Sequence, residues 1–268
     1  MMNTLDVPDL SLRKAIEKEL NKAANQSINT NDMANLRVLD VRESGVGNLT
    51  GLEHAKNLSR LSAGGNSVSN LSPLKGLTNL KSLDFWGNNI DNLTPLEGLT
   101  NLRGLWFQRN QITNISPLQN LVNLESLNLE NNNIENISAL EVLTHLKWLN
   151  LAGNSISNIS LLANFKDLEG LWLYDNVITE IEDLKGLTRL RELSIHNNRI
   201  PDLSPLEDLT RLERLDAEIN SISDLFFLKK LRSRKQLTID IEGPLLLEGL
   251  LDSKWEGGPL RVHIRKFE

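Results

Sequence analysis

Hydrophobic residues recur along most of the chain with a period of 22 residues. In residues 80–99, LKSLDFWGNNIDNLTPLEGL, apolar side chains occupy positions 1, 4, 6, 11, 14, 17 and 20 of the unit. Apolar and polar residues alternate at positions 4 to 6, which is the period of a β-strand, and the rest of the unit is too short for a long helix. Each unit is therefore predicted to form one strand and a short return. Nine units follow one another without insertion, beginning at Leu36, Leu58, Leu80, Leu102, Leu124, Leu146, Leu168, Leu190 and Leu212.

A column of asparagines at position 9 follows the predicted strands. An amide side chain both donates and accepts hydrogen bonds, so these residues are expected to pair with backbone groups of the turns and to form a structural ladder. The column consists of Asn66, Asn88, Asn110, Asn132, Asn154, Asn176, Asn198 and Asn220. Ser-Pro or Thr-Pro steps favour a short helical turn in the returns that contain Pro73, Pro95, Pro117 and Pro205.

Stacking of these units predicts an α/β solenoid: a right-handed curved horseshoe with a parallel sheet on its concave side and short helical or irregular returns on its convex side. The apolar ends of such a stack need covers. Leu12, Ile16 and Leu20 share one face of a predicted helix, with Asp9 or Ser11 as its N-cap. We expect a helical N-terminal cap in residues 1–35, nine repeats in 36–233, and the last strand with a C-terminal cap in 234–268.

Within the expected C-terminal cap, the leucines of residues 245–251 would cover the last repeat. Residues 237–239 continue the repeat register, and residues 260–264 alternate like a further short strand.

Residues 110–118, NQITNISPL, and 154–162, NSISNISLL, resemble the 22-residue leucine-rich repeats of bacterial internalins. Residues 7–20 and 31–36 resemble the internalin N-terminal cap, so the resemblance covers about residues 5 to 241. It implies a secreted or cell-surface protein that binds a host or cell protein with its concave face. The short-repeat regulators of protein phosphatase share the 22-residue period. The alternative is therefore a cytoplasmic scaffold or regulatory segment of a multidomain protein.

Aromatic side chains gather on the expected concave surface, to which positions 3, 5, 7 and 8 of each unit should point. Exposed tryptophan and tyrosine are typical of binding hot spots, although rings on neighbouring strands could also simply pack together. With strands about 4.8 Å apart, the patch would be roughly 20 Å long, which fits a protein or peptide epitope and could also fit a glycan that stacks on tryptophan. A protein is the expected partner, and a glycan is the less favoured alternative. The expected partner-binding residues are Trp86, Trp106, Trp148, Trp172, Tyr174, Arg109, Glu130 and His196.

Charge and composition narrow the range of partners. The net charge of −6 disfavours a general nucleic-acid binder and an anionic membrane surface. No stretch approaches the ~20 apolar residues of a membrane span, and no signal peptide is visible. The chain has no cysteine, which excludes disulfides and cysteine ligands. The concave face should be basic toward the N-terminus and acidic toward the C-terminus, which would orient a partner. We expect a monomer.

One constellation could suggest catalysis. Ser194, His196, Asp216 and Glu218 fall on adjacent units, but an open concave sheet is expected to offer neither an oxyanion hole nor a closed pocket. The four histidines are dispersed and lack metal-ligand spacing, and no phosphate-binding loop precedes a helix. We therefore expect no enzyme activity, no cofactor and no metal.

Overall fold

The computed structural model describes residues 4–222, 238–242 and 261–265. The chain divides into two compact units. Unit 1 comprises Met1–Ile134 with Ser138–Leu143, and unit 2 comprises Glu135–Ile137 with Thr144–Glu268. The expected leucine cover at residues 245–251 lies outside the described residues.

Unit 1 begins with two helices. Helix α1 (Leu10–Glu19) starts at Asp9, whose Oδ1 accepts the backbone N–H of Leu12 at 3.0 Å, so the predicted Asp9 N-cap is confirmed. Helix α2 (Thr30–Asn35) has a capping box in which Asn29 and Asp32 each accept a backbone N–H from the other. Of the three residues on the predicted apolar face of α1, Leu12 and Ile16 are fully buried and Leu20 is partly exposed.

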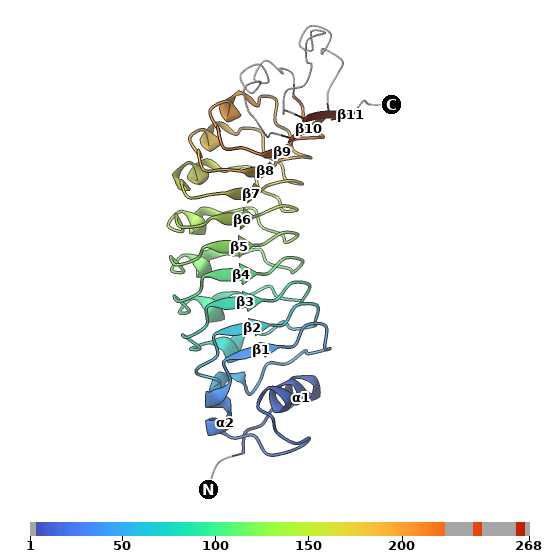
Figure 1. The fold of residues 1–268 in the computed structure, drawn as a ribbon, viewed down its shortest axis with the longest axis vertical. Coiled ribbons are helices and arrows are strands. Elements are labelled where there is room, and N and C mark those ends of the chain that lie inside the picture. The colour runs from blue at the N-terminus through green and yellow to red at the C-terminus, as the bar shows by residue number, and fades with distance from the viewer. Residues whose placement is uncertain (1–3, 223–237, 243–260, 266–268) are drawn as a thin grey trace. The chain divides into compact units, whose positions relative to one another are not determined.

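The strands of unit 1 are short and parallel, and each pairs with the strand of the next repeat. The register is one repeat, because Leu39 aligns with Leu61 and Leu61 with Leu83. Figure 1 shows them stacked in chain order above α1. They are β1 (Val38–Asp40), β2 (Arg60–Ser62), β3 (Ser82–Asp84), β4 (Gly104–Trp106) and β5 (Ser126–Asn128).

Unit 2 repeats this arrangement. Its strands are β6 (Trp148–Asn150), β7 (Gly170–Trp172), β8 (Glu192–Ser194), β9 (Arg214–Asp216), β10 (Thr238–Glu242) and β11 (Arg261–Arg265). All pair in parallel with their neighbours in chain order. The strands β10 and β11 confirm the strands expected around Ile239 and in residues 260–264.

The returns are single 3₁₀ turns rather than α-helices, as expected for so short a unit. Proline occupies the first or second position of four of them, where its missing N–H has no partner to lose. The turns of unit 1 are η1 (Leu52–His54), η2 (Ser72–Leu74), η3 (Thr94–Leu96), η4 (Ser116–Leu118) and η5 (Ser138–Leu140). Those of unit 2 are η6 (Ser160–Asn164), η7 (Glu182–Leu184) and η8 (Ser204–Leu206). The predicted fold, a solenoid of parallel strands with short returns, is confirmed.

The core of each unit lies between the strands and the returns. Leucine and isoleucine at the repeat positions are buried, as the pattern predicts. Phe85, Phe107 and Phe165 are also among the largest fully buried side chains. The rings of Phe85 and Phe107 lie in adjacent repeats with centroids 5.4 Å apart.

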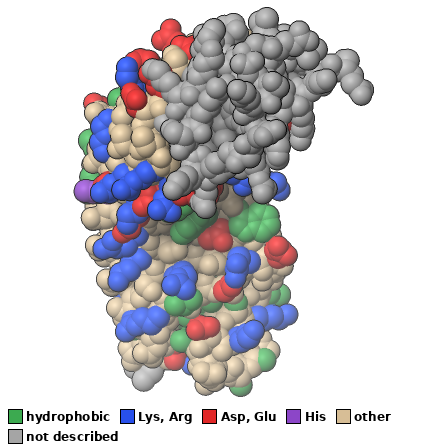
Figure 2. Space-filling view, turned by 45° about the horizontal axis from the view of Figure 1, so that its top comes forward, with side chains coloured by type: hydrophobic (Ala, Val, Ile, Leu, Met, Phe, Trp, Pro, Cys, Tyr) green, Lys and Arg blue, Asp and Glu red, His purple; other side chains and the backbone are tan. Residues whose placement is uncertain are grey.

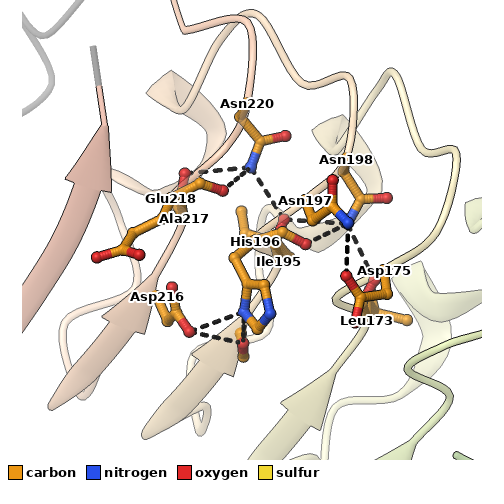
Figure 3. Close-up of polar contacts among 11 residues, drawn as sticks. Leu173, Asp175, Ile195, His196, Asn197, Asn198, Asp216, Ala217, Glu218 and Asn220 are labelled. Atoms are coloured by element: carbon orange, nitrogen blue, oxygen red, sulfur yellow. Dashed lines mark hydrogen bonds and ion pairs between the residues drawn. The ribbon is translucent and has the colours of Figure 1, made fainter. Parts of the chain in front are cut away.

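The asparagine ladder is present, as Asn110 shows. Its Nδ2 donates to the carbonyls of Phe85 at 2.9 Å and Phe107 at 3.0 Å, and its Oδ1 accepts the N–H of Ile90 at 3.0 Å. Each rung therefore ties one repeat to the turn of the preceding repeat. Figure 3 shows two rungs of unit 2, Asn198 and Asn220.

Position 8 of each repeat, which precedes the ladder asparagine in every repeat but the first, adopts left-handed backbone geometry. In unit 1 this position holds Glu43, Gly65, Gly87, Arg109 and Asn131, all with φ between 52° and 68°. In unit 2 it holds Gly153, Asp175, Asn197 and Ile219, with φ between 49° and 63°. Glycine and asparagine tolerate this region, whereas a β-branched residue such as Ile219 is strained there.

Candidate functional site

The outward side chains at positions 3, 5, 7 and 8 of the repeats, here called the strand face, carry the aromatic residues singled out from the sequence. Within each strand, the central leucine is buried while the residues beside it face outward; in β3, for example, Leu83 is buried and Ser82 and Asp84 are partly exposed. On the face drawn in Figure 2, hydrophobic side chains lie in small groups among basic and acidic ones. All five aromatic residues are at least partly exposed: Trp86, Trp106, Trp148, Trp172 and Tyr174.

In unit 2, Trp148 and Trp172 form a stacked pair. Their ring centroids are 5.9 Å apart and the planes differ by 22°. Both rings lie over Gly170, which is the register partner of Trp148 and precedes Trp172 by two residues. A Cβ on Gly170 would stand 2.6 Å from Cζ3 of Trp148 and 2.6 Å from Cη2 of Trp172. The glycine therefore lets the pair lie close against the sheet, and Trp148 remains 38% exposed.

Unit 1 uses glycine in the same way. The indole of Trp86 lies over Gly64, at the same position of the preceding repeat, and the indole of Trp106 lies over Gly104 in its own strand. A Cβ on either glycine would collide with the ring above it. Each tryptophan is thus packed against the backbone of a glycine while part of its side chain stays exposed to solvent, which is the arrangement of a contact surface rather than of a core residue.

Beside the aromatic pair of unit 2, the rings of Tyr174 and His196 stack with centroids 4.5 Å apart and planes 8° apart. Figure 3 shows the imidazole turned toward Asp216, with Nδ1 at 2.8 Å from Oδ2. The hydroxyl of Ser194 donates to the same carboxylate oxygen at 3.3 Å and lies 3.1 Å from Nδ1. These contacts fix the ring orientation of His196.

The contact among Ser194, His196 and Asp216 does not have the geometry of a catalytic relay. A serine hydrolase places serine against one imidazole nitrogen and the carboxylate against the other. Here Nδ1 of His196 faces both groups, and Ser194 donates directly to Asp216. The side chain of Ser194 is consequently held as a structural hydrogen-bond donor, and it is largely buried.

At the first repeats, two carboxylates on the strand face have opposite electrostatic environments. The Arg42 guanidinium hydrogen-bonds Asp40 at 2.6 Å and holds the pKa of that carboxyl below its usual value. Burial raises the pKa of Asp84, and the backbone N–H of Trp86 and the charge of Arg42 offset this only in part. The basic character expected at this end is therefore partly neutralised by ion pairing.

Within the described residues, no cluster of three or more His, Cys, Asp or Glu side chains is arranged to hold a metal ion. Among the same residues, no helix has the length and apolar character needed to cross a membrane.

The family model for leucine-rich repeats (2 copies) matches residues 56–98, 100–142, 144–186 and 188–231, more than half of the chain. The chain belongs to the leucine-rich-repeat family. A search of curated proteins gave no significant match.

Solved structures similar to this leucine-rich-repeat protein include internalins of Listeria monocytogenes. Internalin C2 is 33% identical with a TM-score of 0.75, over 78% of this chain and 92% of the other. Internalin F is 26% identical with a TM-score of 0.68, over 97% of this chain and 91% of the other. The functional domain of InlJ, at 22% identity and a TM-score of 0.74, covers 90% of this chain and 58% of the other and shares the fold. The resemblance to bacterial internalins is thus confirmed.

Two further residues expected to bind a partner lie side by side on the repeat turns of unit 1. The backbone N–H of Arg109 donates to the carbonyl of Glu130 at 2.8 Å. The Arg109 side chain is exposed, whereas Glu130 is partly exposed and accepts from Asn131 at 3.1 Å. The left-handed backbone of Arg109 places this side chain at the edge of the strand face.

The sequence interpretation missed the glycines beneath the tryptophans of this leucine-rich-repeat protein. A signal was present, because Gly-Leu-Trp occurs twice, at residues 104–106 and 170–172, in strands where other repeats have a larger residue in place of the glycine. The meaning of this Gly-Leu-Trp signal becomes clear only when the strand register is known. Glycine weakens a strand, but it is needed where a tryptophan ring packs directly against the strand backbone.

Proposed function

We propose that this chain is a protein-binding module, in the manner of an adhesion or recognition protein, and that the strand face is its contact surface. The observation that carries the proposal is the set of glycine-backed tryptophans: Trp86, Trp106, Trp148 and Trp172. Membership of the leucine-rich-repeat family supports the general role of protein interaction, and the similarity to internalins supports recognition outside the bacterial cell.

The energetic argument rests on rigidity. An aromatic ring already packed against the backbone loses little conformational freedom when a partner covers it, so most of the gain from its burial contributes to binding. Trp148 and Trp172 are stacked on each other, and Tyr174 is stacked on His196. The two explanations weighed for these rings, mutual packing and partner binding, are therefore compatible, because the packing prepares the surface.

The proposal includes the absence of catalysis, a secreted or cell-surface location and a monomeric chain. The one arrangement that could suggest catalysis has a histidine whose Nδ1 serves both neighbours. The partner-binding residues proposed are the five aromatic residues of the strand face together with Arg109, Glu130 and His196. Domain boundaries after residues 35 and 233 are likewise proposed.

The test is capture of surface-biotinylated proteins from a detergent extract of mammalian cells by the immobilised intact chain. Trp106→Ala and Trp172→Ala should each reduce capture of a discrete protein at least tenfold, as hot-spot truncations cost about 2 kcal/mol or more. Gln119→Ala and Lys185→Ala alter exposed residues of the returns and should leave capture unchanged. Equal capture by all four variants would refute the proposal. Capture abolished by deglycosylating the extract would assign the surface to a glycan instead.

A further inference from the structure

The strand face of unit 2 is acidic around its aromatic residues. In the repeats that begin at residues 146, 168, 190 and 212, positions 3, 5, 7 and 8 carry four carboxylates, Asp175, Glu192, Asp216 and Glu218, and one guanidinium, Arg214. Other bases flank the strands at position 2, where Arg191 lies 3.8 Å from Glu213. The local field around Trp148, Trp172 and Tyr174 therefore attracts cations.

The tryptophan pair offers exposed aromatic surface to a cation. Indole carries negative potential on its faces, and a guanidinium or ammonium within about 6 Å of the ring centroid is attracted to it. Trp148 and Trp172 stack on each other over Gly170, and 38% of Trp148 remains exposed. A cation can thus approach the pair without displacing either ring from the sheet.

A carboxylate borders the pair on the side away from Trp148. Gly170 of β7 is in register with Trp148 on one side and with Glu192 of β8 on the other. Glu192 is partly exposed. Among the described residues, no lysine or arginine nitrogen lies within 4.0 Å of its carboxylate, although Arg214 is its register partner on β9. Its charge is accordingly available to a partner.

We propose that Trp148, Trp172 and Glu192 bind an arginine side chain presented by an extended segment of the partner protein. The inference rests on the proposed function and specifies the chemistry of the partner. Arginine fits better than lysine, because a planar guanidinium stacks on indole and pairs with a carboxylate at the same time. The charge pattern favours a basic protein segment over a glycan, because a neutral sugar gains no charge attraction from Glu192 and an anionic one is repelled.

The test uses the ¹H–¹⁵N spectrum of the intact chain, in which each tryptophan indole N–H gives a separate signal assigned by Trp→Phe variants. The probe is the peptide acetyl-Gly-Ser-Arg-Gly-Ser-Arg-Gly-Ser-amide. It should shift the Trp148 and Trp172 signals saturably and leave the Trp86 signal in place. A peptide with citrulline in place of both arginines keeps the shape without the charge, and it should produce no saturable shift.

Glu192→Gln should weaken the peptide affinity about fivefold, the size expected for losing one charge-assisted contact at a partly exposed site. Glu180→Gln is the matched control, because it removes the same charge from an exposed position between β7 and η7 of the same unit. Equal weakening by the two variants would show general charge attraction and overturn the proposal. Equal shifts from the citrulline peptide, or shifts from chitotetraose but not from the arginine peptide, would also overturn it.

The outcome is separable from that of the capture experiment. If Trp172→Ala abolishes capture while Glu192→Gln captures the same protein as the parent chain and the arginine peptide does not bind, the proposed function stands and the arginine site is wrong. If the arginine peptide binds as described but tryptophan substitutions leave capture unchanged, the site exists and the proposed function is wrong.

Discussion

Asp9 joins helix α1 to the first repeat through Gly47. Its Oδ1 caps the helix at the N–H of Leu12, and its Oδ2 accepts the N–H of Gly47 at 2.8 Å and of Asn48 at 3.0 Å. One carboxylate therefore serves as an N-cap and as a link between the N-terminal cap and the turn after β1. Replacing Asp9 therefore removes both contacts, whereas replacing a residue that serves only as an N-cap would remove one.

Asp9→Ala should lower the free energy of unfolding by about 2 kcal/mol, the upper end for an N-cap, because donors in the helix and the repeat turn both lose their acceptor. Urea or thermal unfolding followed by circular dichroism measures this. Asp6→Ala is the control, since Asp6 is exposed. A matched midpoint for Asp9→Ala and the parent would contradict the linking role of Asp9.

The Asp9 carboxylate should also make stability depend on pH. Burial raises its pKa, but backbone N–H groups of Leu12, Gly47, Asn48 and Ser11 together outweigh burial and hold the pKa below the usual value. A carboxylate with a lowered folded-state pKa stabilises the protein above its unfolded-state pKa, and this contribution is lost as pH falls through the folded-state pKa. The difference in melting temperature between the parent and Asp9→Asn should shrink from pH 7 to pH 3. A constant difference would show that the charge is irrelevant.

Asn132→Ala should destabilise unit 1 by about 1–3 kcal/mol, since it leaves buried backbone groups without partners. The side chain of Asn132 donates to the carbonyls of Phe107 and Leu129 and accepts the N–H of Ile112. Asn133→Ala is a matched control on the next residue, which is exposed. Thermal melts that fail to separate these two variants would contradict the structural role of the ladder.

Gly170→Ala should disturb the tryptophan pair while leaving the repeat folded. The added methyl group must displace the rings of Trp148 and Trp172, at a cost of about 1–3 kcal/mol. Near-ultraviolet circular dichroism and the indole N–H signals should change. Gly98→Ala adds the same methyl group where no atom lies within 4 Å and should change neither. Identical spectra for the two variants would mean that the rings do not depend on Gly170.

Ile219→Asn should stabilise unit 2 by about 1 kcal/mol, because it relieves a β-branched residue held at φ 51°. The side chain is 52% exposed, so little packing is lost. Val122→Asn replaces another exposed β-branched residue whose backbone is not left-handed and should give no gain. A melting temperature of Ile219→Asn at or below that of the parent would refute the strain argument.

Much of the fold was predictable because the repeat supplies the same information nine times. A single Leu-x-Leu stretch fits several structures, but its recurrence every 22 residues fixes which side chains face inward. The position of Trp172 on the strand face followed from that count. The packing of Trp172 on Gly170 did not, because ring orientation depends on side-chain torsions and on the neighbouring strand, neither of which the period determines.

For the polar side chains around His196, the sequence predicted only that they lie close together. The sequence placed Ser194, His196 and Asp216 near one another, and the structure confirms their contact. The sequence could not show which imidazole nitrogen of His196 faces the carboxylate. That orientation distinguishes a catalytic relay from a structural contact. Likewise, Gly65, Gly87 and Asn131 at position 8 of the repeat are residues typical of a left-handed turn. Arg109 and Ile219 at the same position are not, so the sequence alone does not predict the turn.

The ladder asparagines bond to their own repeat and to the one before it, as Asn110 does with Phe107, Phe85 and Ile90. A genetic duplication or loss of one whole unit of 66 nucleotides, the coding length of 22 residues, therefore leaves each remaining rung with a partner of the same kind. Insertion or deletion of a single codon within a return keeps the reading frame but shifts the 22-residue spacing. The length of the molecule can thus change in whole repeats without redesign of the core.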